Sequence, residues 1–196
     1  MVMPMFQSLV TADDLARMPD DNYSYELVEG RLVRMSKSGV VHSLCSGRIY
    51  RAVAEHADKH GLGLVLPQDA GFSLRRNPDT VRAPDVGFIS EQQIRTTELP
   101  EGFWPGAPDL VVEVISPNDR RRAVDHKARE WLASGARLVW VVDVRRRTVS
   151  VHRTGSAAVT LTHEEELNGE DVLPGFRLPL TTLFEGLPYR REGNLV

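Results

Sequence analysis

Three ionisable residues, Asp85, Glu113 and Lys127, have types and surroundings that could carry hydrolytic chemistry. Glu113 lies in the run Asp109-Leu-Val-Val-Glu-Val-Ile-Ser-Pro117, which is otherwise apolar on both faces of a strand and therefore predicts the buried centre of a sheet. An ionised carboxylate there costs several kcal/mol unless a cation or hydrogen bonds compensate it. We expect a divalent metal ion, shared with Asp85, to compensate Glu113, with Lys127 nearby.

Asp85 is the expected partner of Glu113 because Pro84-Asp85 opens a strand that could pair with the central one. A hard cation needs oxygen ligands at ~2.0–2.6 Å, so its carboxylates must converge from different segments. Asp109 precedes Glu113 by four positions on one strand, which is roughly 13 Å at ~3.3 Å per residue. That separation is too long for one shared ion, so we interpret Asp109 as a strand-start or turn residue.

Lys127 is the nearest basic residue on the helix expected to fold back over this sheet. Ile115 points to the same side as Glu113, because strand side chains repeat every two residues, so the central strand supplies no cation itself. A lysine at the position of Lys127 could orient a water molecule or stabilise charge on a phosphate.

The elements that would hold these residues follow from the apolar spacing and from the glycines and prolines. The expected order is a helix at 11–18, a hairpin of 23–28 and 31–35, a helix at 42–60, strands at 62–66, 70–74 and 81–89, an irregular excursion at 90–107, the central strand, a helix at 123–134, strands at 137–144, 148–152 and 159–162, and a wrap at 168–184. The strand, helix and strand between Leu110 and Val142 predict a right-handed crossover between parallel strands. We therefore expect a mixed α/β fold, a central mixed sheet flanked by helices, in one domain over 1–196.

The composition is that of a soluble globular protein, with 41% hydrophobic and 26% charged residues. The net charge of −3 argues against a protein that coats nucleic acid nonspecifically. The single cysteine, Cys45, is consistent with a reducing compartment, and Met1–Gln7 has no signal-peptide pattern. No apolar run approaches the ~20 residues that span a bilayer. These features favour a cytoplasmic protein without a membrane partner.

Several motifs together resemble the Uma2 family, which is described as putative restriction endonucleases. They are Tyr25-Glu-Leu-Val-Glu-Gly30, His42 at the start of a helix, Pro84-Asp85-Val86, the central motif Asp109–Pro117, Lys127 and Leu173-Pro-Gly-Phe-Arg-Leu-Pro-Leu180. The resemblance covers roughly residues 8 to 185. It implies a restriction-endonuclease-like core of the PD-(D/E)xK nuclease superfamily, whose members hydrolyse phosphodiester bonds with magnesium.

The same resemblance implies roles for individual residues. Asp85 and Glu113 would hold the metal, and Glu26 would complete the acidic site. In this family the lysine is displaced from the strand to the following helix, and Lys127 matches that position. The chain departs from the family at Ala123 and His126, where members often carry acidic residues. We interpret His42 as a cap or packing residue, with a place beside the active site as the alternative, and Trp131 as part of the core.

The resulting hypothesis is a metal-dependent endonuclease that hydrolyses DNA by metal-activated water, with Mg²⁺, or alternatively Mn²⁺, as cofactor. Its expected catalytic residues are Glu26, Asp85, Glu113 and Lys127, and Arg120, Arg121 and Arg122 are expected to bind the DNA backbone. The sequence is also compatible with a homodimer. Two alternatives remain: a nuclease-like fold that binds DNA or protein without cutting, and a metal-dependent phosphohydrolase acting on RNA or nucleotides.

Overall fold

The computed structural model describes residues 9–19, 21–116 and 119–188; Pro117 of the central motif and Met1–Gln7 lie outside them. The helices are α1 (Ala12–Ala16), α2 (Val40–His60), α3 (Glu91–Thr96), α4 (Arg121–Ala133) and α5 (Leu180–Leu183). The strands are β1 (Tyr25–Val28), β2 (Arg31–Arg34), β3 (Gly63–Pro67), β4 (Phe72–Arg75), β5 (Thr80–Arg82), β6 (Val86–Ser90), β7 (Trp104–Pro105), β8 (Leu110–Val114), β9 (Leu138–Asp143), β10 (Thr148–Arg153), β11 (Val159–Thr162), β12 (Glu166–Asn168) and β13 (Arg177–Pro179). Within the described residues, no helix combines the length and apolarity needed to cross a bilayer.

The central strand β8 lies inside a six-stranded sheet of order β11-β10-β9-β8-β6-β3. It pairs antiparallel with β6 and parallel with β9, and α4 makes the crossover between β8 and β9. The predicted parallel crossover and the predicted pairing of the Asp85 and Glu113 strands are both confirmed. The interior position of β8 explains why its side chains are apolar on both faces.

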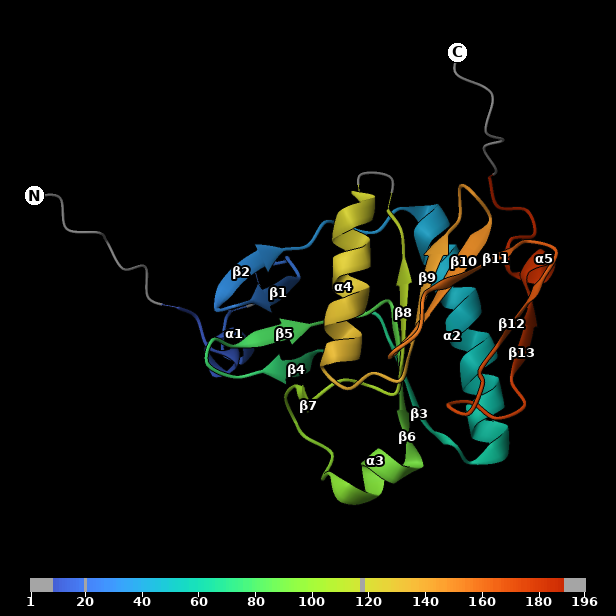
Figure 1. Ribbon diagram of the computed structural model, residues 1–196. Coiled ribbons are helices and arrows are strands. Elements are labelled where there is room, and N and C mark those ends of the chain that lie inside the picture. The colour runs from blue at the N-terminus through green and yellow to red at the C-terminus, as the bar shows by residue number, and fades with distance from the viewer. Residues whose placement is uncertain (1–8, 20, 117–118, 189–196) are drawn as a thin grey trace, which may run out of the picture.

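Two layers cover the six-stranded sheet, with α4 and α2 on opposite sides of β8 (Figure 1). Val112 and Val114 pack into the core on the α2 side, which also contains residues of α5, β12 and β13. Val111 and Ile115 pack on the α4 side with Trp131. Glu113 shares the parity of Val111 and Ile115, so the alternation of the strand directs it toward α4.

A five-stranded sheet of order β2-β1-β5-β4-β7 lies beside this core. The single strand predicted over 81–89 is wrong, because the chain divides there into β5 in the five-stranded sheet and β6 in the six-stranded sheet. Pro84 has no N–H to donate to a ladder, which is the physical reason for the break. The backbone N–H of Ala83 instead reaches the Glu26 carboxylate. The break therefore links the two sheets beside Asp85.

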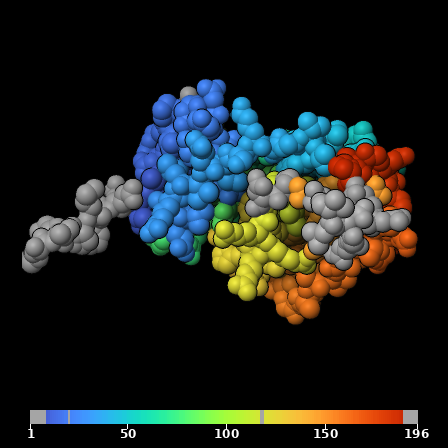
Figure 2. All heavy atoms as spheres, turned by 90° about the horizontal axis from the view of Figure 1, so that it is seen from above, coloured from blue at the N-terminus to red at the C-terminus, as the bar shows by residue number. Residues whose placement is uncertain are grey.

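Smaller differences concern element ends. The excursion predicted as irregular contains the short helix α3 and the short strand β7. The helix α2 begins at Val40, two residues before the predicted start, and ends at His60 as predicted. Gly61 caps it in the left-handed conformation expected of a glycine cap. Seen from above, the β1–β2 region, the start of α2 and α4 form neighbouring parts of one face (Figure 2).

Candidate active site

Asp85 and Glu113 are brought side by side by the pairing of β6 with β8. The register places Val86 opposite Val112, so one further step along the antiparallel pair places Asp85 opposite Glu113. The backbone extends this register, since Asp85 N donates to Val112 O at 3.0 Å. The Asp85 carboxylate then accepts from Val114 N through Oδ2 at 2.7 Å. Asp85 is thus fixed to the strand that carries Glu113.

Glu113 is held by two side chains of α4. Lys127 Nζ lies 3.0 Å from Oε1 and 3.1 Å from Oε2 of Glu113. Trp131 Nε1 donates to Oε1 at 2.8 Å. Lys127 and Trp131 are four residues apart and therefore share one helix face. The protein itself therefore provides part of the compensation that we expected for the buried charge of Glu113.

Glu26 lies on the other side of Lys127. Lys127 Nζ is 3.0 Å from Glu26 Oε1, and Arg82 Nη1 donates to Glu26 Oε2 at 2.7 Å. Leu27 pairs with Val81 in the antiparallel β1–β5 ladder, so Glu26 and Arg82 lie opposite each other on the same face. Arg82 also contacts Glu130 of α4, with Nε at 2.8 Å and Nη2 at 2.6 Å from Oε2.

His42 completes the surroundings of Asp85 from the α2 side. Its Nε2 lies 3.2 Å from Asp85 Oδ2, and its side chain is 8% exposed. Burial lowers the pKa of His42, but hydrogen bonds to Asp85 and to the Val114 backbone outweigh burial and raise it. The interpretation of His42 as a cap is wrong, because Gly39 is the N-cap of α2. His42 instead supports Asp85.

The protonation of the cluster follows from its burial and its charges. Burial raises the pKa of Glu113 to about 7, and the Asp85 and Glu26 carboxylates add to the rise while Lys127 opposes it. Burial also opposes ionisation of Glu26, yet the Lys127 and Arg82 cations hold its pKa below the ordinary value. For Lys127, burial alone would lower the pKa, but the Glu113 and Glu26 carboxylates raise it overall. The lysine is therefore a permanent cation.

The metal donors that the site offers are two carboxylates and a backbone carbonyl. Within residues 9–19, 21–116 and 119–188, no group of three or more His, Cys, Asp or Glu side chains is arranged to hold a metal ion. Asp85 and Glu113, with the carbonyl of Val114, are hard oxygen donors of the kind that Mg²⁺ prefers. Because Mg²⁺ usually keeps several waters, this donor set fits it without a third carboxylate.

The three predicted backbone-binding arginines lie at the start of α4. Arg120 is its N-cap residue, Arg121 and Arg122 begin the helix, and all three are exposed. No acidic residue occupies the first turn, and no side chain caps it. Arg121 also lines a cavity of about 200 Å³ beside Ile115 and Val141. The same helix thus presents arginines at its start and Lys127 further along.

The structure brings Glu26, Asp85, Glu113 and Lys127 together, as the sequence predicted, although their chemical roles stay predictions. Three contributors were missed: Arg82, Glu130 and the indole N–H of Trp131. For His42, the alternative of a place beside the active site fits the structure better than a helix cap. Glu130 and Trp131 follow Lys127 by three and four positions, so helical spacing could have indicated them. Nothing local to Arg82 indicated its partners, which lie on distant segments.

Two comparisons with known proteins bear on the family and the fold, and a third found nothing. The model of the Uma2 family, described as "putative restriction endonuclease", matches residues 12–181. A crystal structure of a putative nuclease of the family DUF820 from Anabaena variabilis is similar, with a TM-score of 0.77 and 18% identity over 89% of this chain and 97% of that one. A search of curated proteins found no match. The expected mixed α/β, restriction-endonuclease-like fold is confirmed.

Proposed function

Because the chain belongs to the Uma2 family of nuclease-like proteins, we propose that it is a metal-dependent endonuclease that hydrolyses phosphodiester bonds in DNA. The family match and the shared fold support a nuclease in general terms. The DNA substrate, the metal requirement and the residue roles are the parts that this proposal adds.

The proposed metal ligands are Asp85 and Glu113, with the Val114 carbonyl. Asp85 is fixed by Val114 N and His42 through one oxygen, and its Oδ1 accepts no hydrogen bond from the described residues. Glu113 lies opposite it and has a pKa of about 7, so it binds a divalent cation in exchange for a proton near neutral pH. When bound, the metal supplies positive charge that activates a water molecule and offsets the charge of the phosphate.

Lys127 is proposed to stabilise negative charge on the phosphate. Its raised pKa keeps it protonated, so it acts as a cation and hydrogen-bond donor and not as a general base. Its side chain is 19% exposed, so the lysine is not fully enclosed by the protein. A fixed donor in a partly dry site stabilises developing charge more strongly than water does.

Arg120, Arg121 and Arg122 are proposed to bind the DNA backbone beside this centre. The N-terminus of a helix carries the positive end of the helix dipole, so three arginines there are repelled by the dipole and by each other. Binding of an anion is favourable at such a position. A phosphate at the start of α4 would relieve this repulsion and accept hydrogen bonds from the arginines. The chain leads directly from these arginines to Lys127, so backbone binding and the proposed chemistry share one rigid element.

One observation carries the proposal: two carboxylates from paired strands and a lysine from the crossover helix meet in a partly buried cluster. The test is cleavage of supercoiled plasmid DNA by purified protein with Mg²⁺, with Mn²⁺ or with EDTA. The wild type should cut with metal only, and Glu113→Gln should cut at least ~10²-fold more slowly. Glu101→Gln, at an exposed site between α3 and β7, is the matched control and should cut normally.

RNA and nucleotides tested under the same conditions separate the alternatives. Cleavage of RNA or a nucleotide in place of DNA would point to a different phosphohydrolase. Binding of DNA without any cleavage, and without binding of Mg²⁺ by calorimetry, would indicate a binding module and overturn the proposal.

A further inference from the structure

A continuous chain of charges extends from the proposed metal ligands to the five-stranded sheet. It runs from Glu113 to Lys127, Glu26, Arg82 and Glu130, and every contact lies between 2.6 and 3.1 Å. Glu26 and Arg82 are its most buried members, with side chains 3% and 12% exposed. This series of ion pairs starts on β8, passes through Lys127 of α4 to β1 and β5, and returns to α4 at Glu130.

Glu26 is already fully occupied by groups of the protein. Its Oε1 accepts from Lys127 Nζ at 3.0 Å and from Ala83 N at 3.2 Å, and its Oε2 accepts from Arg82 at 2.7 Å. A carboxylate engaged in this way by two cations and a backbone amide is well placed to hold Lys127 and poorly placed to bind a metal. Glu26 is therefore placed to hold Lys127, whereas Asp85 and Glu113 are the proposed metal ligands.

Arg82 is the second cation that holds Glu26 in this arrangement. Three carboxylates, those of Glu113, Glu26 and Glu130, share two cations in this chain of charges. Without Arg82, Lys127 would be the one cation left to Glu113 and Glu26, Glu130 would lose its contact with Arg82, and Glu26 would be a buried carboxylate with one cation fewer. A lysine would not replace Arg82 fully, because the guanidinium uses separate nitrogens in one rigid plane, Nη1 toward Glu26 and Nε and Nη2 toward Glu130, and a single amine does not reproduce that geometry.

We propose that Arg82 is a positioning residue, which fixes Glu26 so that Glu26 keeps Lys127 in the site when Glu113 turns its oxygens to a metal ion. Lys127 lies within hydrogen-bond distance of both oxygens of Glu113, so a metal ion bound to Glu113 would compete with the amine for that carboxylate. The remaining anionic partner of Lys127 is then Glu26. The part of this inference that concerns the metal-bound protein rests on the proposed function, and the part that concerns the protein without metal does not.

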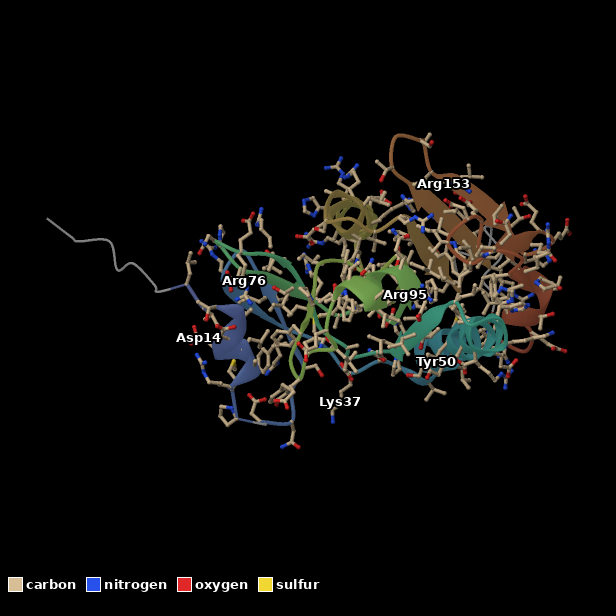
Figure 3. The ribbon with its side chains drawn as sticks, turned by 90° about the horizontal axis from the view of Figure 1, so that it is seen from below. Asp14, Lys37, Tyr50, Arg76, Arg95 and Arg153 are labelled. Atoms are coloured by element: carbon tan, nitrogen blue, oxygen red, sulfur yellow. The ribbon has the colours of Figure 1, made fainter. Side chains whose placement is uncertain are left out.

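The experiment is amine acetylation of the intact protein, followed by peptide mass spectrometry. The chain has three lysines, and Lys37 and Lys59 are exposed internal references. Lys37 projects from the segment between β2 and α2 (Figure 3). In the wild type, Lys127 should be acetylated at least about tenfold more slowly than Lys37 and Lys59, both with and without Mg²⁺. The factor of about ten corresponds to the free energy of one charged hydrogen bond.

Arg82→Met should raise the Lys127 rate about tenfold, and further when Mg²⁺ is added. Arg75→Met is the matched control: it removes an arginine of the same sheet, paired with Glu29 at the surface, and should change nothing. Glu130→Gln weakens the hold on Arg82 from the other side and should raise the rate less. If Arg82→Met does not fold, the acetylation rate of Lys127 in Glu130→Gln tests the proposal by itself.

The two proposals fail in distinguishable ways. If the wild type neither binds Mg²⁺ nor cuts DNA, the proposed function fails, while faster acetylation in metal-free Arg82→Met still supports the positioning role. If the wild type cuts, Arg82→Met should lower kcat about tenfold or more for plasmid DNA and leave KM nearly unchanged. Unchanged acetylation in both variants, or Mg²⁺ making wild-type Lys127 as reactive as Lys37, would overturn the inference.

Discussion

Lys127 Nζ lies almost equally far from the two oxygens of Glu113, at 3.0 Å from Oε1 and 3.1 Å from Oε2. A lysine in this position covers the carboxylate that we propose as a metal ligand. The amine and the metal ion therefore compete for the same oxygens, and this competition leads to the first prediction.

Lys127→Met should bind Mg²⁺ at least as tightly as the wild type at pH 8.5, because the competing amine is gone. The same variant should cut DNA at least ~10²-fold more slowly, because the cation that stabilises the phosphate is lost. Calorimetry with Mg²⁺ and plasmid cleavage measure the two effects. Lys59→Met, at an exposed position near the end of α2, is the control. Loss of Mg²⁺ binding together with activity would contradict the competition.

Glu113→Gln should stabilise the metal-free protein at pH 8. The pKa of Glu113 is about 7 in the folded state, against an ordinary value of 4.5. Between these values the folded state keeps a proton that the unfolded state has lost, so the free energy of unfolding falls as the pH rises through this window. The neutral amide avoids this loss, which we expect to amount to about 1–3 kcal/mol at pH 8.

The gain should disappear near pH 4.5, where the carboxyl of the wild type is also protonated in the folded state. Urea unfolding in EDTA at the two pH values measures it, with Glu101→Gln as the reference. A Gln variant that is less stable than the wild type at both pH values would show that the pair with Lys127 outweighs the burial of the charge.

Mg²⁺ affinity should rise with pH up to about 7 and then level off, because the metal needs Glu113 without its proton. Below the pKa, the dissociation constant should change by about tenfold for each pH unit. Calorimetry in two buffers with different ionisation enthalpies should also detect about one proton released per metal bound at pH 6. An affinity that is flat between pH 5.5 and 8.5 would exclude Glu113 as a titrating ligand.

Replacing Arg120, Arg121 and Arg122 together by Ala should weaken DNA binding without preference for sequence. The slope of log K against log salt should fall by up to ~0.9 for each arginine that contacts a phosphate. Fluorescence anisotropy with a duplex in EDTA measures the slope. A triple Ala variant at Arg17, Arg95 and Arg177 has the same change in net charge at exposed sites elsewhere and should lose much less.

Sequence alone determined the parts of the site that depend on local pattern. The apolar run around Glu113 marked an interior strand because strand side chains alternate, and Pro84-Asp85 marked the start of its neighbour. Lys127 was expected to fold back over the sheet because a helix must connect parallel strands. These inferences needed only the periods of strands and helices and the high free energy of a buried charge.

Only the tertiary structure decided which cation belongs to which carboxylate. Arg82 lies 56 positions from Glu26 and 48 from Glu130, and the predicted strand over 81–89 even placed it in the wrong sheet. The break at Pro84 leaves Arg82 in the five-stranded sheet and places Asp85 directly before β6, an interior strand of the six-stranded sheet. Ion pairs depend on distances of a few ångströms between segments, and those distances are set by how the two sheets meet across α4, which no local pattern records.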